Sequence, residues 1–165
     1  MTKQNNIQTE KGILLNALHH NGKILVLPNI WDPLGAALLE RLGYAAAATA
    51  SASIAFSNGY ADGENIPFKD LLEILKRIVH SVKIPVTADI ESGYASNISM
   101  LEENTKQLID AGISGINIED SAHNDNNITS VITQCKKISS IRNTASKMGV
   151  PLFINARTYI YLKAH

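Results

Sequence analysis

The stretch Ala88-Asp89-Ile90-Glu91-Ser92-Gly93-Tyr94 follows an apolar run that opens with Lys83-Ile84-Pro85-Val86, and it ends in a glycine-containing loop. This pattern is typical of a buried strand that runs into a loop. Because strand side chains alternate in direction, Asp89 and Glu91 point to the same side, where two carboxylates repel each other unless a cation lies between them. Mg2+ and Mn2+ prefer such oxygen ligands. The stretch therefore indicates either a divalent-metal site or an ordinary acidic loop after a strand.

Strands, polar loops and helices alternate along the whole chain. Besides the strand just described, apolar or small-residue runs predict strands at 23–28, 45–54, 113–118 and 151–156. Apolar periodicity and capping residues predict helices at 12–18, 33–43, 68–82, 97–110 and 129–148. Continuous apolar strands between helices indicate a parallel sheet that is covered on its faces. We therefore expect residues 1–165 to form a single α/β domain.

Polar residues gather after the predicted strands. They are Asn29, Asp32, Ser51, Asp62, Asp89, Glu91, Glu119, Asp120 and Arg157. A (β/α)8 barrel builds its active site at the C-terminal ends of its strands, from several strands at once. A flavodoxin-like domain with a five-stranded parallel sheet fits the chain length better. The acidic residues at consecutive strand ends instead favour the single mouth of a barrel, with a metal-centred site for an anionic substrate.

The composition is that of an ordinary globular protein, with 45% hydrophobic residues and 15 basic against 15 acidic residues. A formal net charge of zero argues against a nucleic-acid partner and against a polybasic membrane patch. No apolar run approaches the roughly 20 residues of a membrane span, and residues 1–10 lack the pattern of a signal peptide. We therefore expect a cytoplasmic protein with no nucleic-acid or membrane partner.

Cys135 is the only cysteine, which excludes an internal disulfide and a cysteine-rich metal site. Its spacing from Val131, Ile132 and Ile138 places it on an apolar helical stripe. The expectation is a core position rather than a reactive thiol.

Several blocks of the chain resemble the isocitrate lyase/phosphoenolpyruvate mutase superfamily, nearest its phosphonomutase-like and 2-methylisocitrate-lyase-like members. In order along the chain, the blocks are Leu27-Pro28-Asn29-Ile30-Trp31-Asp32, Thr49-Ala50-Ser51-Ala52-Ser53, Gly59-Tyr60-Ala61-Asp62-Gly63-Glu64, Thr87-Ala88-Asp89-Ile90-Glu91-Ser92-Gly93-Tyr94, Gly115-Ile116-Asn117-Ile118-Glu119-Asp120-Ser121 and Ile154-Asn155-Ala156-Arg157-Thr158. Several blocks that match in order, from about residue 22 to residue 158, indicate the family far more specifically than any single block does.

The resemblance implies a TIM-type (β/α)8 barrel that binds Mg2+ (or Mn2+) and a small 2-oxo or 2-hydroxy carboxylate. It implies a lyase or phosphonomutase that makes or breaks a C–C or P–C bond through an enolate-like intermediate. By position, the resemblance assigns the metal to Asp89, Glu91 and Glu119, the substrate to Ala50, Ser51, Ala52, Asp89 and Arg157, and catalytic roles to Asp62, Glu119 and Arg157. The full-length relatives pair into homo-oligomers.

Three departures from the family pattern limit what the resemblance implies. The lyases of the family carry a Lys-Lys-Cys-Gly-His loop after the fourth strand, where this chain has residues 121–127 without a cysteine. Tyr159 takes a position that is usually acidic in phosphonomutase-like members. An eight-stranded barrel needs about 200 to 250 residues, so we expect an incomplete barrel of about five β/α units, a truncated gene product or fragment.

An incomplete barrel leaves the edges of its sheet without a neighbouring strand. We expect the apolar residues 24–27 and 152–154 to be exposed at these edges. The expected activity is that of the parent lyase or phosphonomutase, impaired by the missing strands. The alternative is an inactive remnant that acts as a binding or subunit-interaction module.

Overall fold

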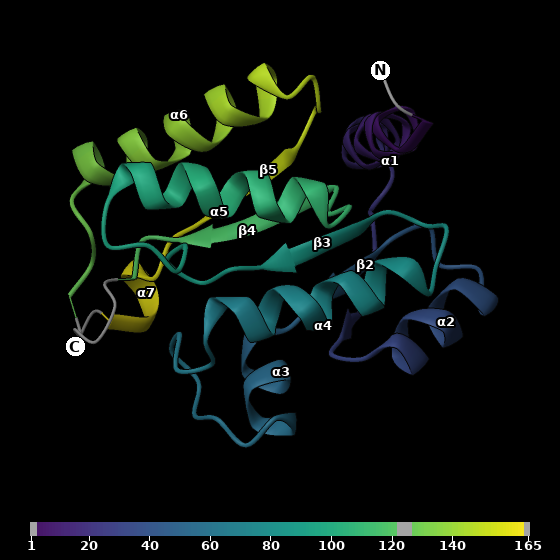
Figure 1. Ribbon diagram of the computed structural model, residues 1–165, viewed down its shortest axis with the longest axis horizontal. Helices are drawn as coiled ribbons and strands as arrows, with labels where there is room; N and C mark the ends of the chain where they lie inside the picture. Colours follow the sequence, from purple (N-terminus) through teal and green to yellow (C-terminus); the bar gives the residue numbers. More distant parts are fainter. Residues whose placement is uncertain (1–2, 122–126, 164–165) are drawn as a thin grey trace.

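The computed structural model describes residues 3–121 and 127–163, and Figure 1 shows how their helices and strands are arranged. The strands are β1 (Asn29–Ile30), β2 (Ala47–Thr49), β3 (Val86–Asp89), β4 (Gly115–Glu119) and β5 (Phe153–Arg157). The helices are α1 (Lys3–His20), α2 (Pro33–Arg41), α3 (Ser51–Ser57), α4 (Phe68–His80), α5 (Ile98–Asp110), α6 (Val131–Lys147) and α7 (Ile160–Lys163). The alternation of strands and helices confirms the predicted α/β class.

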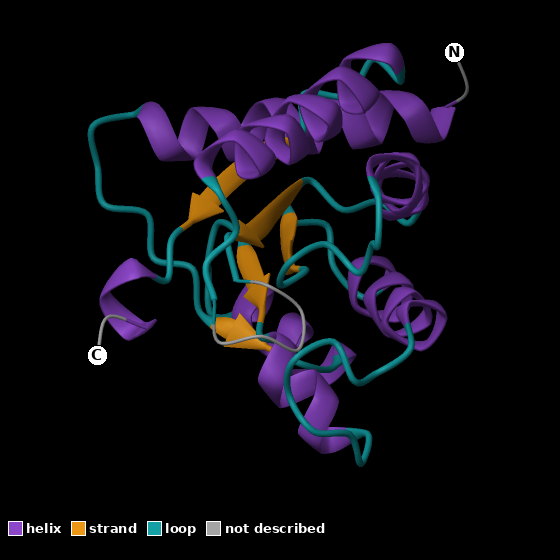
Figure 2. Cartoon of the chain, turned by 90° about the vertical axis from the view of Figure 1, so that its left-hand side faces the viewer, coloured by secondary structure: helices purple, strands orange, loops and turns teal. Residues whose placement is uncertain are grey.

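The five strands pair in parallel and in chain order, β1-β2-β3-β4-β5. A flavodoxin-like sheet would instead reverse its strand order at a switch point. Strands that each add to the same side of the previous one form a curved row, as in a (β/α) barrel (Figure 2). The strand order therefore excludes the flavodoxin-like alternative and confirms a barrel arc of five units.

The core lies between the sheet and the helices α4, α5 and α6, which run along one of its faces (Figure 1). Helix α4 buries an apolar face of Leu71, Leu72, Ile74, Leu75, Ile78 and Val79. All four residues of β3 are buried, as expected of a central parallel strand. Each fully buried leucine or isoleucine stabilises the fold by roughly 1.5–3 kcal/mol, so α4 and the central strands form a rigid support for the loops at the strand ends.

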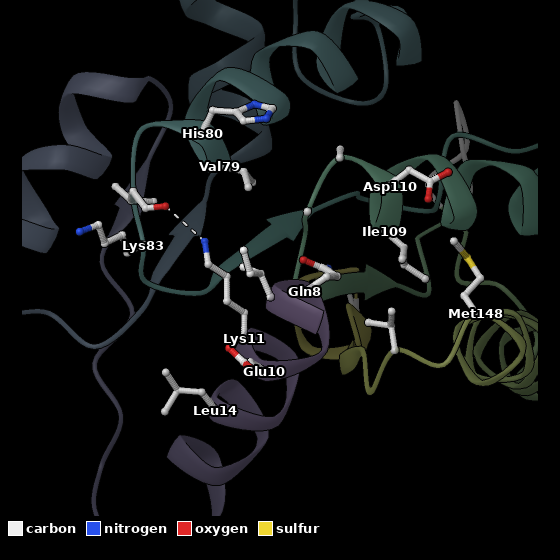
Figure 3. Close-up of a pocket in the computed structure, with 15 residues that line it drawn as sticks. Gln8, Glu10, Lys11, Leu14, Val79, His80, Lys83, Ile109, Asp110 and Met148 are labelled. Carbon is white, nitrogen blue, oxygen red and sulfur yellow. Dashed lines mark hydrogen bonds between the residues drawn. The ribbon is translucent and has the colours of Figure 1, made fainter. Parts of the chain in front are cut away.

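Helix α1 packs against the N-terminal ends of the strands. The side chain of Gln8 donates to the carbonyl of Ile113, Lys11 Nζ donates to Val82 O at 3.2 Å, and Asn16 Nδ2 donates to Pro151 O at 2.9 Å. A cavity of about 1010 Å3 lies beside α1, between it, the end of α4 and the segment that follows α5 (Figure 3). This cavity lies at the opposite end of the strands from the predicted site. Helix α1 covers residues 3–20, so the expected helix at 12–18 is the second half of a longer helix.

The first two predicted strands were placed wrongly. The strand expected at 23–28 is limited to Asn29–Ile30, and the Ile24 side chain is 95% exposed. Strand β1 pairs with β2 alone, and Pro28 has no N–H to donate to a neighbour. The strand expected at 45–54 ends at Thr49, and Ser51–Ser57 form α3 instead.

Three further expectations are corrected on the second half of the chain. Ser130, not Thr129, caps α6, through a 3.2 Å hydrogen bond from Thr133 N to Ser130 Oγ. Cys135 is exposed, as are Val131 and Ile132, because the apolar stripe at the start of α6 does not face the core. Leu152 is fully buried rather than exposed at the sheet edge. In the part of the chain that the structure describes, no helix has the length and apolar character needed to cross a membrane.

Candidate active site

Asp89 ends β3 with a buried carboxylate. Its Oδ2 accepts a hydrogen bond from Ser51 Oγ at 3.0 Å, and its backbone N–H donates to Thr49 Oγ1 at 3.0 Å. Both partners come from the end of β2 and the start of α3, because β2 and β3 are paired neighbours. The small-residue turn and the acidic end of β3 are therefore in contact.

Glu119 ends β4 and is also buried, beside Asp89. Arg157 Nη1 lies 3.0 Å from Glu119 Oε1 and 3.8 Å from Asp89 Oδ2. The sheet register explains this arrangement, since Glu119 pairs with Arg157 across β4 and β5. One guanidinium thus bridges the carboxylates of two adjacent strands, and its side chain remains 41% exposed.

Two hydroxyl groups complete the surroundings of Glu119. Tyr159 donates to Glu119 Oε1 at 2.9 Å and Ser121 donates to Glu119 Oε2 at 3.0 Å. Burial raises the pKa of Glu119 and the nearby charge of Asp89 raises it further, whereas the Tyr159 hydrogen bond and the Arg157 charge lower it. Burial also raises the pKa of Tyr159 to about 12, so its hydroxyl is a donor at neutral pH.

Glu91 lies in the loop after β3, and its carboxylate is held by other groups than those around Asp89 and Glu119. Its Oε1 accepts from Tyr94 Oη at 3.0 Å and its Oε2 accepts from the backbone N–H of Glu64 at 2.9 Å. Burial raises the pKa of Glu91 to about 7, against the lowering effect of these two hydrogen bonds. The three predicted metal ligands therefore lie in one region but occupy two different environments.

The remaining predicted residues lie around this region. Ala50 is the N-cap of α3 and Ala52 lies in its first turn, both half-buried next to Ser51. Asp62 is exposed on the loop between α3 and α4, and its negative charge contributes to the raised pKa of Glu91. Residues 122–126, where the lyase loop of the family would lie, fall outside the described residues.

The donor set fits a hard divalent cation. Asp89, Glu91 and Glu119 are all buried, and carboxylate oxygens are the ligands that Mg2+ prefers. Within residues 3–121 and 127–163, no group of three or more acidic, histidine or cysteine side chains is close enough to hold a metal by itself. Mg2+ usually keeps several waters and takes only one or two carboxylates together with substrate oxygens, so a tighter cluster is not required.

Four further residues contribute to the site without having been assigned a role from the sequence, although Asp120 was among the polar residues expected at the strand ends. Glu64 and Tyr94 hold Glu91, Tyr159 holds Glu119, and Asp120 accepts from Thr158 Oγ1 at 2.6 Å and from Tyr159 N at 2.8 Å. All four lie within a few residues of a predicted site residue. Glu64, Tyr94 and Asp120 lie in the blocks that resemble the family and Tyr159 directly follows the last of them, but the direction of their side chains depends on loop conformation.

Comparison with known proteins places these features in a family. Residues 15–165 match the family model described as phosphoenolpyruvate phosphomutase. An uncharacterized protein of Mycobacterium tuberculosis is 31% identical over 149 residues, which is 90% of this chain and 54% of that protein. The 2-methylisocitrate lyase of Aeropyrum pernix is 31% identical over 109 residues, which is 66% of this chain and 35% of that enzyme.

Solved structures agree with the sequence matches. A candidate phosphonomutase of Burkholderia cenocepacia J2315 superposes with a TM-score of 0.90 at 39% identity, over 93% of this chain and 63% of the other. A candidate lyase/mutase of the same organism has a TM-score of 0.89 at 30% identity, over 96% of this chain and 57% of the other. The chain thus spans about half to two-thirds of the length of these proteins, and only a third of the Aeropyrum pernix lyase.

Proposed function

Since the chain belongs to the phosphoenolpyruvate phosphomutase family, within the isocitrate lyase/phosphoenolpyruvate mutase superfamily, we propose that it carries the active-site end of a Mg2+-dependent lyase or phosphonomutase. The substrate is a small 2-oxo or 2-hydroxy carboxylate, and Mn2+ would serve in place of Mg2+. The observation that carries this proposal is the bridge of Arg157 between the buried carboxylates of Asp89 and Glu119.

Arg157 supplies the anion-binding group of the proposed site. Its guanidinium has five N–H donors in a planar fork that matches a carboxylate or phosphonate bidentately. The side chain is 41% exposed, so donors remain for a ligand beyond the contact with Glu119. Tyr159 lies against the guanidinium, with its ring centroid 5.0 Å from the Arg157 Cζ, and Arg157 Nη2 donates to its hydroxyl at 3.1 Å. These contacts orient the fork before a substrate arrives.

Asp89, Glu119 and Glu91 are the residues that would hold Mg2+ in this proposal, with Asp62 on the adjacent loop. A bound Mg2+ supplies Lewis-acid polarisation of a substrate oxygen and so favours charge development there. A fold relative, phosphonopyruvate hydrolase, was solved in complex with oxalate and Mg2+. Oxalate carries two adjacent carboxylate groups, as a planar 2-oxo carboxylate carries adjacent oxygens. This supports the proposed ligand class for the present chain.

The start of α3 serves as the opposite wall of the site. Ala50 and Ala52 flank Ser51 with small side chains, and the Ser51 hydroxyl lies 3.0 Å from Asp89 Oδ2. The first backbone N–H groups of a helix have no partner within the helix. In the proposed site these amides bind one carboxylate of the substrate, beside the Ser51 hydroxyl that donates to Asp89, while Arg157 binds its other anionic group.

A second candidate is a binding or subunit-interaction module without turnover. Large apolar side chains are exposed on α2 and at the start of α6, including Leu34, Leu42 and Val131 at 69%, 74% and 79% exposure. Exposed apolar surface of this kind marks interaction sites. Size-exclusion chromatography with light scattering measures self-association, which favours the module only where the chain also fails to bind an oxo-acid.

Isothermal titration calorimetry with oxalate tests the proposed function. We expect oxalate to bind in the presence of Mg2+ and to bind at least tenfold more weakly in EDTA, because metal and anion share the site. Equal oxalate binding with and without Mg2+ would contradict the metal-centred site. No oxalate binding in either condition, together with strong self-association, would favour the interaction module.

A further inference from the structure

Glu64, Glu91 and Tyr94 share an unusual backbone conformation. Their φ angles are +57°, +49° and +53°, and the other positive-φ residues of the described chain are all glycines. A left-handed conformation costs a non-glycine residue on the order of 1–3 kcal/mol and persists only when the surrounding structure holds it. Three such residues, from two loops that are about 30 positions apart in the chain, therefore require a shared set of contacts.

The three residues form a closed ring of hydrogen bonds. Glu64 N donates to Glu91 Oε2 at 2.9 Å, and Tyr94 Oη donates to Glu91 Oε1 at 3.0 Å. Glu64 Oε1 in turn accepts from Tyr94 N at 3.0 Å and from Ser92 Oγ at 2.7 Å. Each residue of the ring thus contacts both others, and both oxygens of Glu91 are held.

The ring joins two loops that carry different parts of the proposed site. Glu64 lies two residues after Asp62 on the loop that leads to α4, and Glu91 lies two residues after Asp89. Lys137 of α6 donates to Ser92 O at 2.8 Å and so anchors the second loop from its other side. The Glu64 side chain accepts from the 92–94 turn, and its negative charge also raises the pKa of Lys137, against the lowering effect of burial.

We propose that Glu64 is a positioning residue of the metal site. Its side chain fixes the 92–94 turn and its N–H fixes the Glu91 carboxylate, which together set where Glu91 and the Asp62 loop stand relative to Asp89. This inference rests on the proposed function, since it takes Glu91 as part of the metal site. When a residue that orients a metal ligand is removed, the metal affinity commonly falls 10- to 100-fold.

The test compares three variants by Mg2+ titration calorimetry and by amide hydrogen exchange. Glu64→Ala removes both side-chain hydrogen bonds, whereas Glu64→Gln keeps an oxygen that accepts from Ser92 and Tyr94 in the same place. Glu73→Ala is the matched control, because Glu73 is an exposed glutamate of α4 that pairs with Lys76. We expect Glu64→Ala to weaken Mg2+ binding at least tenfold and to speed exchange of the Tyr94 amide, with Glu64→Gln and Glu73→Ala near the wild type.

Two outcomes would overturn the inference. If the Tyr94 amide exchanges faster in Glu64→Ala but the variant binds Mg2+ as the wild type does, Glu64 is a loop anchor only. Equal losses in Glu64→Gln and Glu64→Ala would show that the charge of Glu64, not its positioning contacts, is responsible. A wild-type protein that binds no Mg2+ would contradict the proposed function, and the exchange rates would then decide separately whether Glu64 fixes the turn.

Discussion

Glu119 and Glu91 are two buried glutamates in one region, but their carboxylates are satisfied in different ways. Glu119 lies 3.0 Å from the Arg157 guanidinium, whereas Glu91 accepts from a backbone N–H and a tyrosine hydroxyl. A guanidinium on a partly exposed side chain can exchange its partner when an anion arrives, but a backbone amide in a constrained loop cannot. The comparison teaches that one side of the site is built to respond to ligand and the other is fixed by the fold.

The most severe change to this arrangement is the loss of the carboxylate that lies between the two glutamates. Asp89→Asn should abolish the Mg2+-dependent rise in the thermal midpoint, because a metal that prefers the folded state stabilises it only through its ligands. The metal-free variant should melt close to the wild type, since a crowded carboxylate is relieved and Asn keeps an acceptor for Glu91 N. Differential scanning calorimetry with and without Mg2+ measures both effects. A wild-type Mg2+ response in Asp89→Asn would remove Asp89 from the metal site.

The pH dependence of stability sharpens the contrast on the Glu91 side. The pKa of Glu91 is about 7 in the fold, whereas its ordinary value is 4.5. The folded state therefore binds the proton of Glu91 more tightly than the unfolded state does. Protonated Glu91 therefore makes its full contribution to the free energy of unfolding below pH 4.5. This contribution, at most about 3 kcal/mol, is lost as the pH rises to about 7.

Denaturant unfolding of the metal-free protein at several pH values checks this expectation. Glu91→Gln, which cannot ionise, should lose less stability than the wild type between pH 4.5 and 7.5. Saturating Mg2+ should reverse the wild-type trend, because metal binding favours the ionised carboxylate. Identical pH profiles of the variant and the wild type would show that Glu91 is not the group that titrates.

The smallest expected effect concerns Arg157, on the side of the site that can exchange its partner for a ligand. Arg157→Lys keeps the positive charge near Glu119 but loses the planar fork, so oxalate affinity in Mg2+ should fall about tenfold, as expected for one or two charge-assisted hydrogen bonds. Stability should change little, because the side chain is partly exposed. A structural role for Arg157 predicts the opposite pattern, a lower thermal midpoint with unchanged oxalate binding. Calorimetric titration and thermal melting of the same sample separate the two roles.

The two sides of the site also differ in how far the sequence predicts them. Asp89, Glu119 and Arg157 could be placed together from sequence, because each ends a strand of a parallel sheet and strand ends share one edge. The ring around Glu91 could not, since left-handed backbone is signalled by glycine and here it occurs at two glutamates and a tyrosine. Tertiary contacts, not local preference, hold those residues.

Errors in the fold have a similar cause. Residues 45–54 are small and uncharged, a composition that suits either a central strand or a helix, and the chain uses both in succession. Cys135 has helical spacing from apolar neighbours, but periodicity reports which residues share a face and not whether that face is covered. The structure at both positions could not be predicted from the local sequence, because the contacts that decide it come from elsewhere in the chain.

The contacts of helix α1 have a consequence for the order in which the chain folds. Gln8, Lys11 and Asn16 donate to carbonyls of Ile113, Val82 and Pro151, which are 71 to 135 positions further along the chain. A chain is synthesised from its N-terminus, so α1 emerges first but cannot complete its contacts until Pro151, just before β5, has left the ribosome. Contacts of such long sequence separation slow folding, because loop closure precedes their formation. During synthesis, the first helix of this protein therefore completes its contacts only after four of the five strands have been made.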